Sequence, residues 1–209
     1  MTVHTWIAFS VAAGIVLVIP GPTIISVVSH SLAHGRRAVI PLVIGVTLGD
    51  FTAMSLSLLG VGAIMATSAT LFSTLKVVGA LYLIYLGVKL WRSDPKVEES
   101  NSTVKPSVSN GSLVRSLFLT TTLNPKSLAF FTAFLPQFVN PSEQILPQLL
   151  VLGGTFLFFA AVNASIYALF AGHMRERIQS PRARRLLNRC GGTALIGAGF
   201  LTAAMRRAS

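Results

Sequence analysis

The first 35 residues contain no Asp, Glu, Lys or Arg, and blocks of similar length with almost no charge recur along the chain. An α-helix needs about 20 apolar residues to cross the hydrocarbon of a bilayer, so each block is long enough for one crossing. The composition agrees, because 52% of the 209 residues are hydrophobic and 11% are charged, whereas about 25% of a soluble domain is charged. The sequence therefore predicts a helical membrane protein.

Six segments are predicted to span the membrane, so the expected fold is all-α, a polytopic bundle of six transmembrane helices. Their approximate ranges are 5–29, 39–65, 69–90, 113–138, 146–172 and 190–205. The last segment is short, which leaves five spans and an interfacial helix as an alternative. No basic residue precedes the first segment and no clear cleavage site follows it, so we expect no cleaved signal peptide.

The positions of the basic residues predict the orientation, because positive charges are retained on the cytoplasmic side. The loops around 30–38, 89–115 and 173–189 are predicted to be cytoplasmic, and both termini are predicted to face outward. Arg206 and Arg207 do not fit this six-span topology. The net charge of +11 follows from these loops and does not indicate a nucleic-acid partner. The basic residues of the three predicted cytoplasmic loops are Arg36, Arg37, Lys89, Arg92, Lys96, Lys105, Arg115, Arg175, Arg177, Arg182, Arg184, Arg185 and Arg189.

Residues 94–112 are rich in Ser, Asn, Lys and Glu and are predicted to form a cytoplasmic linker. The linker separates residues 1–93 from residues 113–209, and each part holds three predicted spans. An odd number of spans in each part predicts two repeats of opposite orientation in the membrane. An offset of 104 residues supports this weakly, because it aligns residues 20–22 with 124–126 and Gly49 with Gly153.

Prolines interrupt two of the predicted spans at corresponding places. Pro20, Gly21 and Pro22 lie deep in the first span, and Asn124 and Pro125 lie near the middle of the fourth. Proline removes a backbone donor and breaks or kinks a helix. Paired breaks in two halves are typical of transporter binding sites and their hinges. A packing kink is the alternative, because prolines are frequent in membrane helices.

Asp50 is the only acidic residue inside any predicted span, and Gly45 and Gly49 before it allow another helix to approach closely. A charged side chain at the bilayer centre costs about 3 kcal/mol on insertion scales, so Asp50 is expected to face the interior of the bundle. There it can accept a proton from one side of the membrane and release it to the other, which would couple transport to protons. A fixed ion pair with Lys126 is the alternative.

Lys126 follows Pro125 and lies near the middle of the fourth span, where its ammonium needs a partner or a wet cavity. Asp50 and the carboxylate of a bound substrate are both candidates. Asn124 and Asn163 either line the same cavity or form interhelical hydrogen bonds. The predicted substrate-binding residues are Gly21, Pro22, Asn124, Lys126 and Asn163, and the predicted helix-packing residues are Gly45, Gly49 and Gly153.

Several classes of site are not indicated. His30 and His34 lack acidic or cysteine neighbours, so they do not predict a metal site. No phosphate-binding GxxxxGK[ST] loop occurs, and no cofactor is expected. The pattern therefore favours a secondary transporter over an enzyme. A passive metabolite channel and a membrane-embedded hydrolase of the Ser-Lys type remain the alternatives.

Four segments of the chain resemble those of a known family. IPGPTIISVVSHSLAHGRRA with GVTLGD, LKVVGALYLIYLGVKLWR and NPKSLAFFTAFLPQFV occur in the order typical of the LysE/RhtB amino-acid exporters, which include homoserine and threonine efflux translocators. The resemblance covers residues 19–139. It implies a multi-pass exporter of amino acids or related metabolites in the bacterial inner membrane, driven by the proton motive force. The matching positions are Pro20, Gly21, Pro22, Gly35, Arg36, Gly45, Gly49, Asp50, Gly79, Asn124, Pro125 and Lys126.

The combined prediction is an exporter that moves an amino acid outward while protons move inward. Its expected partners are the amino acid, protons and the lipid bilayer, and a homo-oligomer is compatible with the pattern. Asp50 would be the proton-coupling carboxyl group. Lys126 would be its counter-ion or would contact the carboxylate of the substrate.

Overall fold

The computed structural model describes residues 1–67, 69–92, 109–140 and 142–171, together with 185–186, 188–193, 196–197 and 200. The regular structure of these residues is entirely helical, which confirms the predicted all-α class. The elements are α1 (Val3–Val18), α2 (Pro22–His34), the 3-10 helix η1 (Gly35–Ala38), α3 (Val39–Thr67), α4 (Ala69–Arg92), α5 (Asn110–Thr122), α6 (Pro125–Ala129), the π-helix η2 (Phe130–Phe134), the 3-10 helix η3 (Leu135–Phe138) and α7 (Ile145–Leu169).

The described helices cover the first five predicted segments, two of which are divided, whereas much of the sixth, 190–205, lies outside the described residues. Segment 5–29 is divided into α1 and α2, and segment 113–138 is divided into α5, α6, η2 and η3. Helix α5 begins at Asn110, so the last three residues of the predicted linker, 110–112, are helical. The side chain of Ser109 accepts a hydrogen bond from the Ser112 amide and so caps the helix. The rest of the linker, residues 94–108, and Arg206 and Arg207 lie outside the described residues.

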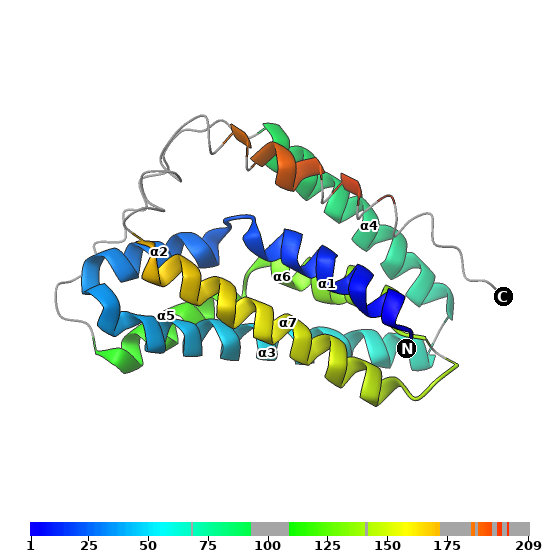
Figure 1. The fold of residues 1–209 in the computed structure, drawn as a ribbon. Helices are drawn as coiled ribbons and strands as arrows, with labels where there is room; N and C mark the ends of the chain where they lie inside the picture. Colours follow the sequence, from blue (N-terminus) through cyan, green and yellow to red (C-terminus); the bar gives the residue numbers. More distant parts are fainter. Residues whose placement is uncertain are drawn as a thin grey trace.

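Among the described residues, two helical stretches are long and apolar enough to cross a membrane, by length and composition: Pro22–Gly60 and Ile145–Leu169. Figure 1 shows that α1 and α2 follow one another along the bundle, that α3 returns in the opposite direction, and that α7 lies antiparallel to α3. At the turn between α2 and α3, Gly35 has a φ of 68°, a conformation that glycine adopts without strain.

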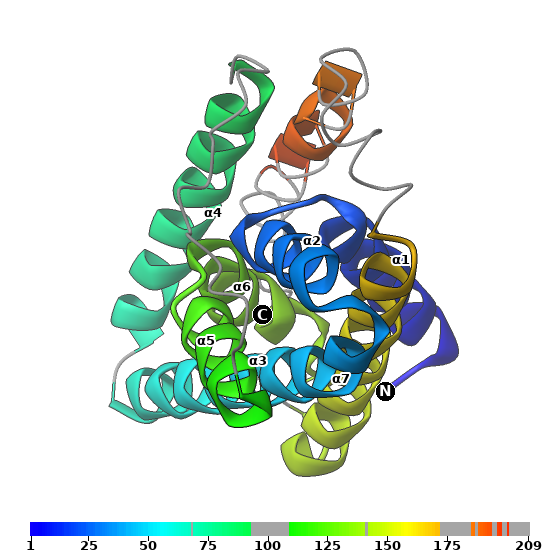
Figure 2. The ribbon, with the colours of Figure 1, turned by 90° about the vertical axis from the view of Figure 1, so that its left-hand side faces the viewer.

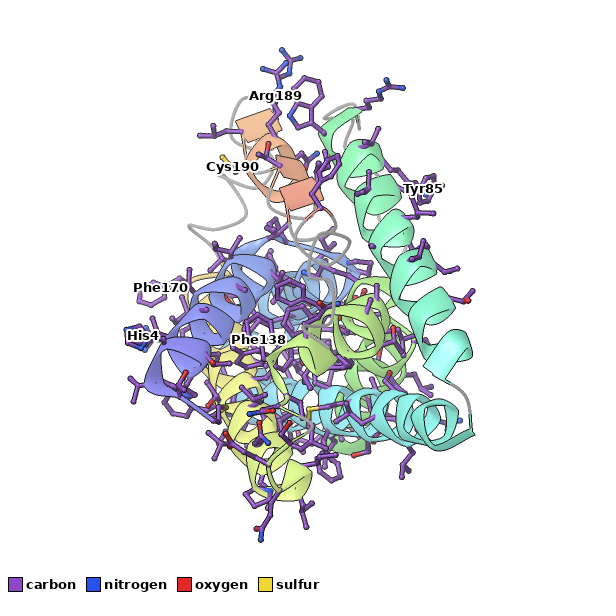
Figure 3. The ribbon with its side chains drawn as sticks, turned by 90° about the vertical axis from the view of Figure 1, so that its right-hand side faces the viewer. His4, Tyr85, Phe138, Phe170, Arg189 and Cys190 are labelled. Atoms are coloured by element: carbon purple, nitrogen blue, oxygen red, sulfur yellow. The ribbon has the colours of Figure 1, made fainter. Side chains whose placement is uncertain are left out.

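Helix α4 lies to one side of the remaining helices, together with the described residues of 185–200 (Figure 2). Glycines allow these two segments to pack closely, because a Cβ atom on Gly87 would lie only 2.7 Å from the Gly192 carbonyl oxygen. The guanidinium of Arg189 lies 5.1 Å from the centre of the Trp91 ring. On the other face of α4, Tyr85 points away from the bundle (Figure 3).

Close packing through small residues also joins α3 to α5 and α7. A Cβ atom on Gly45 would lie 2.6 Å from the Val114 carbonyl oxygen, and one on Gly49 would lie 2.7 Å from Cβ of Thr121. A Cβ atom on Gly153 would lie 2.8 Å from Cε of Met54. The absence of side chains at these positions lets the helix backbones approach each other.

Two apolar clusters form the core, one at each end of the bundle. The aromatic cluster centres on η2 and η3 and includes Phe9, Phe130, Phe131, Phe134, Phe138 and Phe156. Phe138 lies inside the bundle in Figure 3. The aliphatic cluster lies among α2, α3, α5 and α7 and includes Ile24, Val27, Leu42, Val46, Leu117 and Ala164. Both clusters draw residues from α3 and α7, so these two helices run through the whole core.

Candidate functional site

The two interrupted helices break in the same way. The first helix ends at Val18, and α2 begins at Pro22 after Gly21, which is extended. The second ends at Thr122, and α6 begins at Pro125 after Asn124. Each proline occupies the first position of a helix. A backbone N–H at that position would have no intrahelical acceptor, so its absence costs no helical hydrogen bond. The two helix starts, Pro22 and Pro125, lie 103 positions apart in the sequence.

A layer of buried polar side chains lies at the level of the breaks and separates the two apolar clusters. Along α3, Val46 belongs to the aliphatic cluster and Ala53 to the aromatic cluster, with Asp50 between them. Along α7, Asn163 lies between Ala160 of the aromatic cluster and Ala164 of the aliphatic cluster. Asn163 is half-buried, whereas Asp50 and the other members of this polar layer are buried: Thr23, Thr121, Asn124 and Ser127.

Lys126 extends to the broken end of α1. Its Nζ atom donates hydrogen bonds to the carbonyl oxygens of Val16, at 3.0 Å, and Ile19, at 2.8 Å. Gly21 lies beside the ammonium, since a Cβ atom there would be 3.5 Å from Nζ. The Asp50 carboxylate, the protein partner predicted for Lys126, is not the group to which the ammonium donates here. The reason is that the interrupted helix presents free carbonyls at the same depth.

Two side chains of α7 bind the remaining carbonyls at this end of α1. Asn163 Nδ2 donates to the Leu17 carbonyl at 3.0 Å, and the Tyr167 hydroxyl donates to the Val18 carbonyl at 2.9 Å. A helix leaves its last four carbonyls without intrahelical partners. Here side chains of α6 and α7 satisfy all four, so the end of α1 is held by residues more than 100 positions away in the sequence.

The starts of α2 and α6 are joined to each other. Asn124 caps α6 by accepting a hydrogen bond from the Lys126 amide at 3.0 Å, and its Nδ2 donates to Thr23 Oγ1 at 3.1 Å. The Thr121 hydroxyl also approaches Thr23 Oγ1, at 3.4 Å. Pro22, in contrast, is exposed at the start of α2.

Asp50 is 3% exposed and lies beside the Ser127 hydroxyl, within the electrostatic reach of Lys126. The two charged groups interact through space but do not form a salt bridge, and in the described part of the chain Asp50 Oδ1 has no hydrogen-bond partner. A buried carboxyl oxygen without a partner is costly. In the part of the chain that the structure describes, Asp50 Oδ1 therefore retains the capacity to accept a hydrogen bond.

The structure thus brings together four of the predicted residues at the break: Gly21, Asp50, Asn124 and Lys126. Asn163 reaches the same place through the Leu17 carbonyl. Thr23, Ser127 and Tyr167 were missed. Hydroxyl side chains are common throughout the predicted spans and so gave no signal. Tyr167 follows Asn163 by four residues, however, and this spacing places both on one face of α7.

The hydrogen bonds that the structure describes for Lys126 Nζ go to two carbonyls of α1 and not to a serine hydroxyl, the partner that the Ser-Lys alternative requires. Among the residues that the structure describes, no group of three or more His, Cys, Asp or Glu side chains is arranged to hold a metal ion.

Known proteins are similar in sequence to this chain over most of its length. A family sequence profile described as "LysE type translocator" matches residues 14–206. An uncharacterized membrane protein of Vibrio cholerae is 32% identical over 97% of this chain and 98% of its own length. The homoserine/homoserine lactone efflux protein of Salmonella typhimurium is 30% identical over the full length of both chains. The leucine efflux protein of an Enterobacter species is 30% identical over 96% of this chain and 93% of its own. No solved structure matches.

Proposed function

Because the chain belongs to the family of LysE type translocators, we propose that it is a secondary active transporter that exports an amino acid or a related small metabolite in exchange for protons. The observation on which this rests is the pair of broken helices that meet around Asp50 and Lys126. A buried carboxyl group beside a buried ammonium can bind a zwitterion and a proton alternately. The named activities of the relatives, efflux of homoserine, homoserine lactone and leucine, indicate the class of substrate.

The proposed architecture has six membrane-spanning helices in two inverted repeats, in the bacterial inner membrane. The equivalent starts of α2 and α6 support the repeat, because each follows a break and begins with proline. In inverted-repeat transporters such breaks line the substrate site and one repeat moves against the other. Residues 20–22 and 124–125 would then be the hinges of alternating access.

Asp50 is assigned the proton-coupling role. Its position between the two apolar clusters places it away from both ends of the bundle, where a coupling group would exchange protons with each side in turn. Asp50 Oδ1, which lacks a hydrogen-bond partner in the described part of the chain, is the oxygen that would accept the proton. Protonation would remove the negative charge that faces Lys126 and so alter the affinity for a charged substrate.

The test is transport by the purified protein in lipid vesicles with an acidic lumen. Labelled homoserine and leucine are supplied outside, with threonine and lysine as further probes. Proton antiport predicts accumulation above the external concentration, which a protonophore abolishes. A passive channel predicts equal concentrations on both sides, with or without the pH gradient. Equilibration without accumulation would therefore contradict the proposed coupling.

The variant Asp50→Asn isolates the coupling step. It should lose accumulation yet still exchange external labelled substrate for internal unlabelled substrate, because the binding site remains while the titratable group is gone. Ser57→Ala, two turns further along the same face of α3, is a control for changing a buried polar side chain. Glu143→Gln is a control for losing an exposed carboxyl group. Undiminished accumulation by Asp50→Asn would exclude Asp50 as the coupling residue.

A further inference from the structure

We infer that the broken end of α1 is a binding site for a primary ammonium group, that Lys126 occupies this site as an internal ligand, and that the ammonium of the transported molecule displaces it. The inference rests on the proposed function for the identity of that molecule. The site itself rests on the described contacts of Lys126 with the Val16 and Ile19 carbonyls.

The residues that follow α1 leave its carbonyls available to other groups. Where a helix ends in the usual way, the next two backbone N–H groups bind back to its last carbonyls. At this break the first residue after the cap, Pro20, has no N–H group, and the described backbone hydrogen bonds include none from the Gly21 amide to the end of α1. Other groups must therefore donate hydrogen bonds to these carbonyls, because a carbonyl without a donor is energetically costly in apolar surroundings.

The local charge selects a cation. The carboxyl end of a helix bears a partial negative charge of about half an electron. The Asp50 carboxyl adds a further negative group within electrostatic reach, and it forms no salt bridge with Lys126. An ammonium ion satisfies both the charge and the carbonyls, because it has three N–H donors and no acceptor. A carboxylate at the same place would be repelled.

The geometry separates fixed donors from an exchangeable one. Asn163 and Tyr167 bind the Leu17 and Val18 carbonyls from α7, which lies against α1 and keeps them in place. Lys126 binds the other two carbonyls through a flexible four-carbon stem that begins in the first turn of α6. The lysine can withdraw by rotation of its own flexible stem, and an incoming primary ammonium would restore the positive charge at the two carbonyls.

Removal of the lysine nitrogen should create a vacancy that a small ammonium ion fills. In Lys126→Met the stem keeps its length and only the ammonium is lost, so NH4⁺ is the matching probe. In Lys126→Ala the matching probe is n-propylammonium, which replaces the missing stem as well. The readout is the midpoint of thermal unfolding of the full chain in detergent micelles. Each variant should be stabilised by several degrees, saturably, by its own probe.

Controls separate this effect from salt and from lysine loss in general. Tetramethylammonium has the charge but no N–H donor, and it should stabilise neither variant at equal ionic strength. Lys89→Ala removes an exposed lysine from α4 and should not respond to n-propylammonium. The site is overturned if neither variant responds to its probe, or if tetramethylammonium acts as well as the primary ammonium ions. Two variants are used so that failure of one to fold leaves the other to decide.

Displacement of Lys126, as distinct from a purely structural contact, is tested with leucinamide, which has a primary ammonium but no carboxylate. If the ligand and Lys126 compete for the same carbonyls, leucinamide should bind Lys126→Met at least tenfold more tightly than the unmodified chain, while N-acetyl-leucinamide binds neither. Equal binding to both proteins, or binding to neither, would overturn the displacement. These measurements use no transport, so a failed vesicle assay with intact ammonium binding would reject only the proposed function.

Discussion

The Nδ2 atom of Asn124 lies 3.1 Å from Oγ1 of Thr23, so the residue that caps α6 is hydrogen-bonded to the first turn of α2. The two residues come from the two interrupted helices and are 101 positions apart. Both are buried. This bond joins the start of α2 to the start of α6. It thereby places Lys126, two residues after Asn124, opposite the end of α1.

We expect Thr23→Val to weaken this junction. The valine keeps the shape of threonine but cannot accept from Asn124, and interhelical hydrogen bonds of this kind in membrane proteins contribute about 0.5–2 kcal/mol. Thermal unfolding in micelles should shift to lower temperature accordingly. The control is Thr52→Val, because the Thr52 hydroxyl donates only to the Leu48 carbonyl of its own helix. Equal effects of the two substitutions would show that the junction adds nothing to stability.

Gly49→Ala should separate α3 from α5. The added Cβ would lie 2.7 Å from Cβ of Thr121 and 2.9 Å from the Phe118 carbonyl oxygen, so backbone as well as side chain obstructs it. Overpacking of this kind costs about 1–3 kcal/mol, against a gain in helix propensity of up to about 1 kcal/mol. A net loss of stability is expected in the same unfolding assay.

Gly60→Ala is the matched control for that substitution. It lies on the same helix, and a Cβ atom there would meet nothing within 4 Å. It should leave the unfolding temperature unchanged or raise it. If Gly49→Ala proves as stable as Gly60→Ala, the close approach of α3 and α5 is not present in the protein.

Tyr167→Phe should destabilise the broken end of α1. The substitution removes only the hydroxyl that donates to the Val18 carbonyl, and Tyr167 is buried. An unsatisfied buried carbonyl costs about 1–3 kcal/mol. Tyr85→Phe removes a hydroxyl from an exposed tyrosine on α4 and serves as the comparison. The prediction fails if the unfolding temperatures of the two variants differ from that of the unmodified chain by the same amount.

A weak pH dependence is expected from Glu143, in the loop before α7. Its hydrogen bond to the amino terminus of Met1, then that to Asn140, and then the positive charge of the amino terminus lower the pKa of the Glu143 carboxyl below its ordinary value of 4.5. A lowered pKa means that the unfolded chain binds this proton more readily than the folded protein does. The contribution to stability is therefore full above pH 4.5 and is lost as the pH falls through the lower, folded-state pKa.

The measurement compares the unfolding temperature of Glu143→Gln with that of the unmodified chain across this pH range. The difference should be small, because the pair is exposed and screened by solvent, and it should shrink further in high salt. A difference that grows as the pH falls would have the wrong sign and would contradict the described ion pair.

Much of the candidate site was predictable because prolines and charges have strong local consequences. A proline cannot donate a backbone hydrogen bond, so residues 20–22 and 124–125 mark the ends of helices whatever surrounds them. A carboxyl group among apolar residues must turn inward, so Asp50 was expected in the interior, where it lies. Small residues such as Gly45 and Gly49 indicated a close helix contact in the same way, although not which helix makes it.

Sequence patterns alone therefore determined the helical class, the positions of the breaks and the identity of the buried charges, because each follows from properties of neighbouring residues. The partners of those charges were decided by the tertiary structure. Lys126 binds carbonyls 107 and 110 positions away, and Asn163 binds one 146 positions away. No local rule encodes such distances, since a carbonyl is present at every residue. Only the packing of α6 and α7 against the end of α1 shows which carbonyls are free to accept.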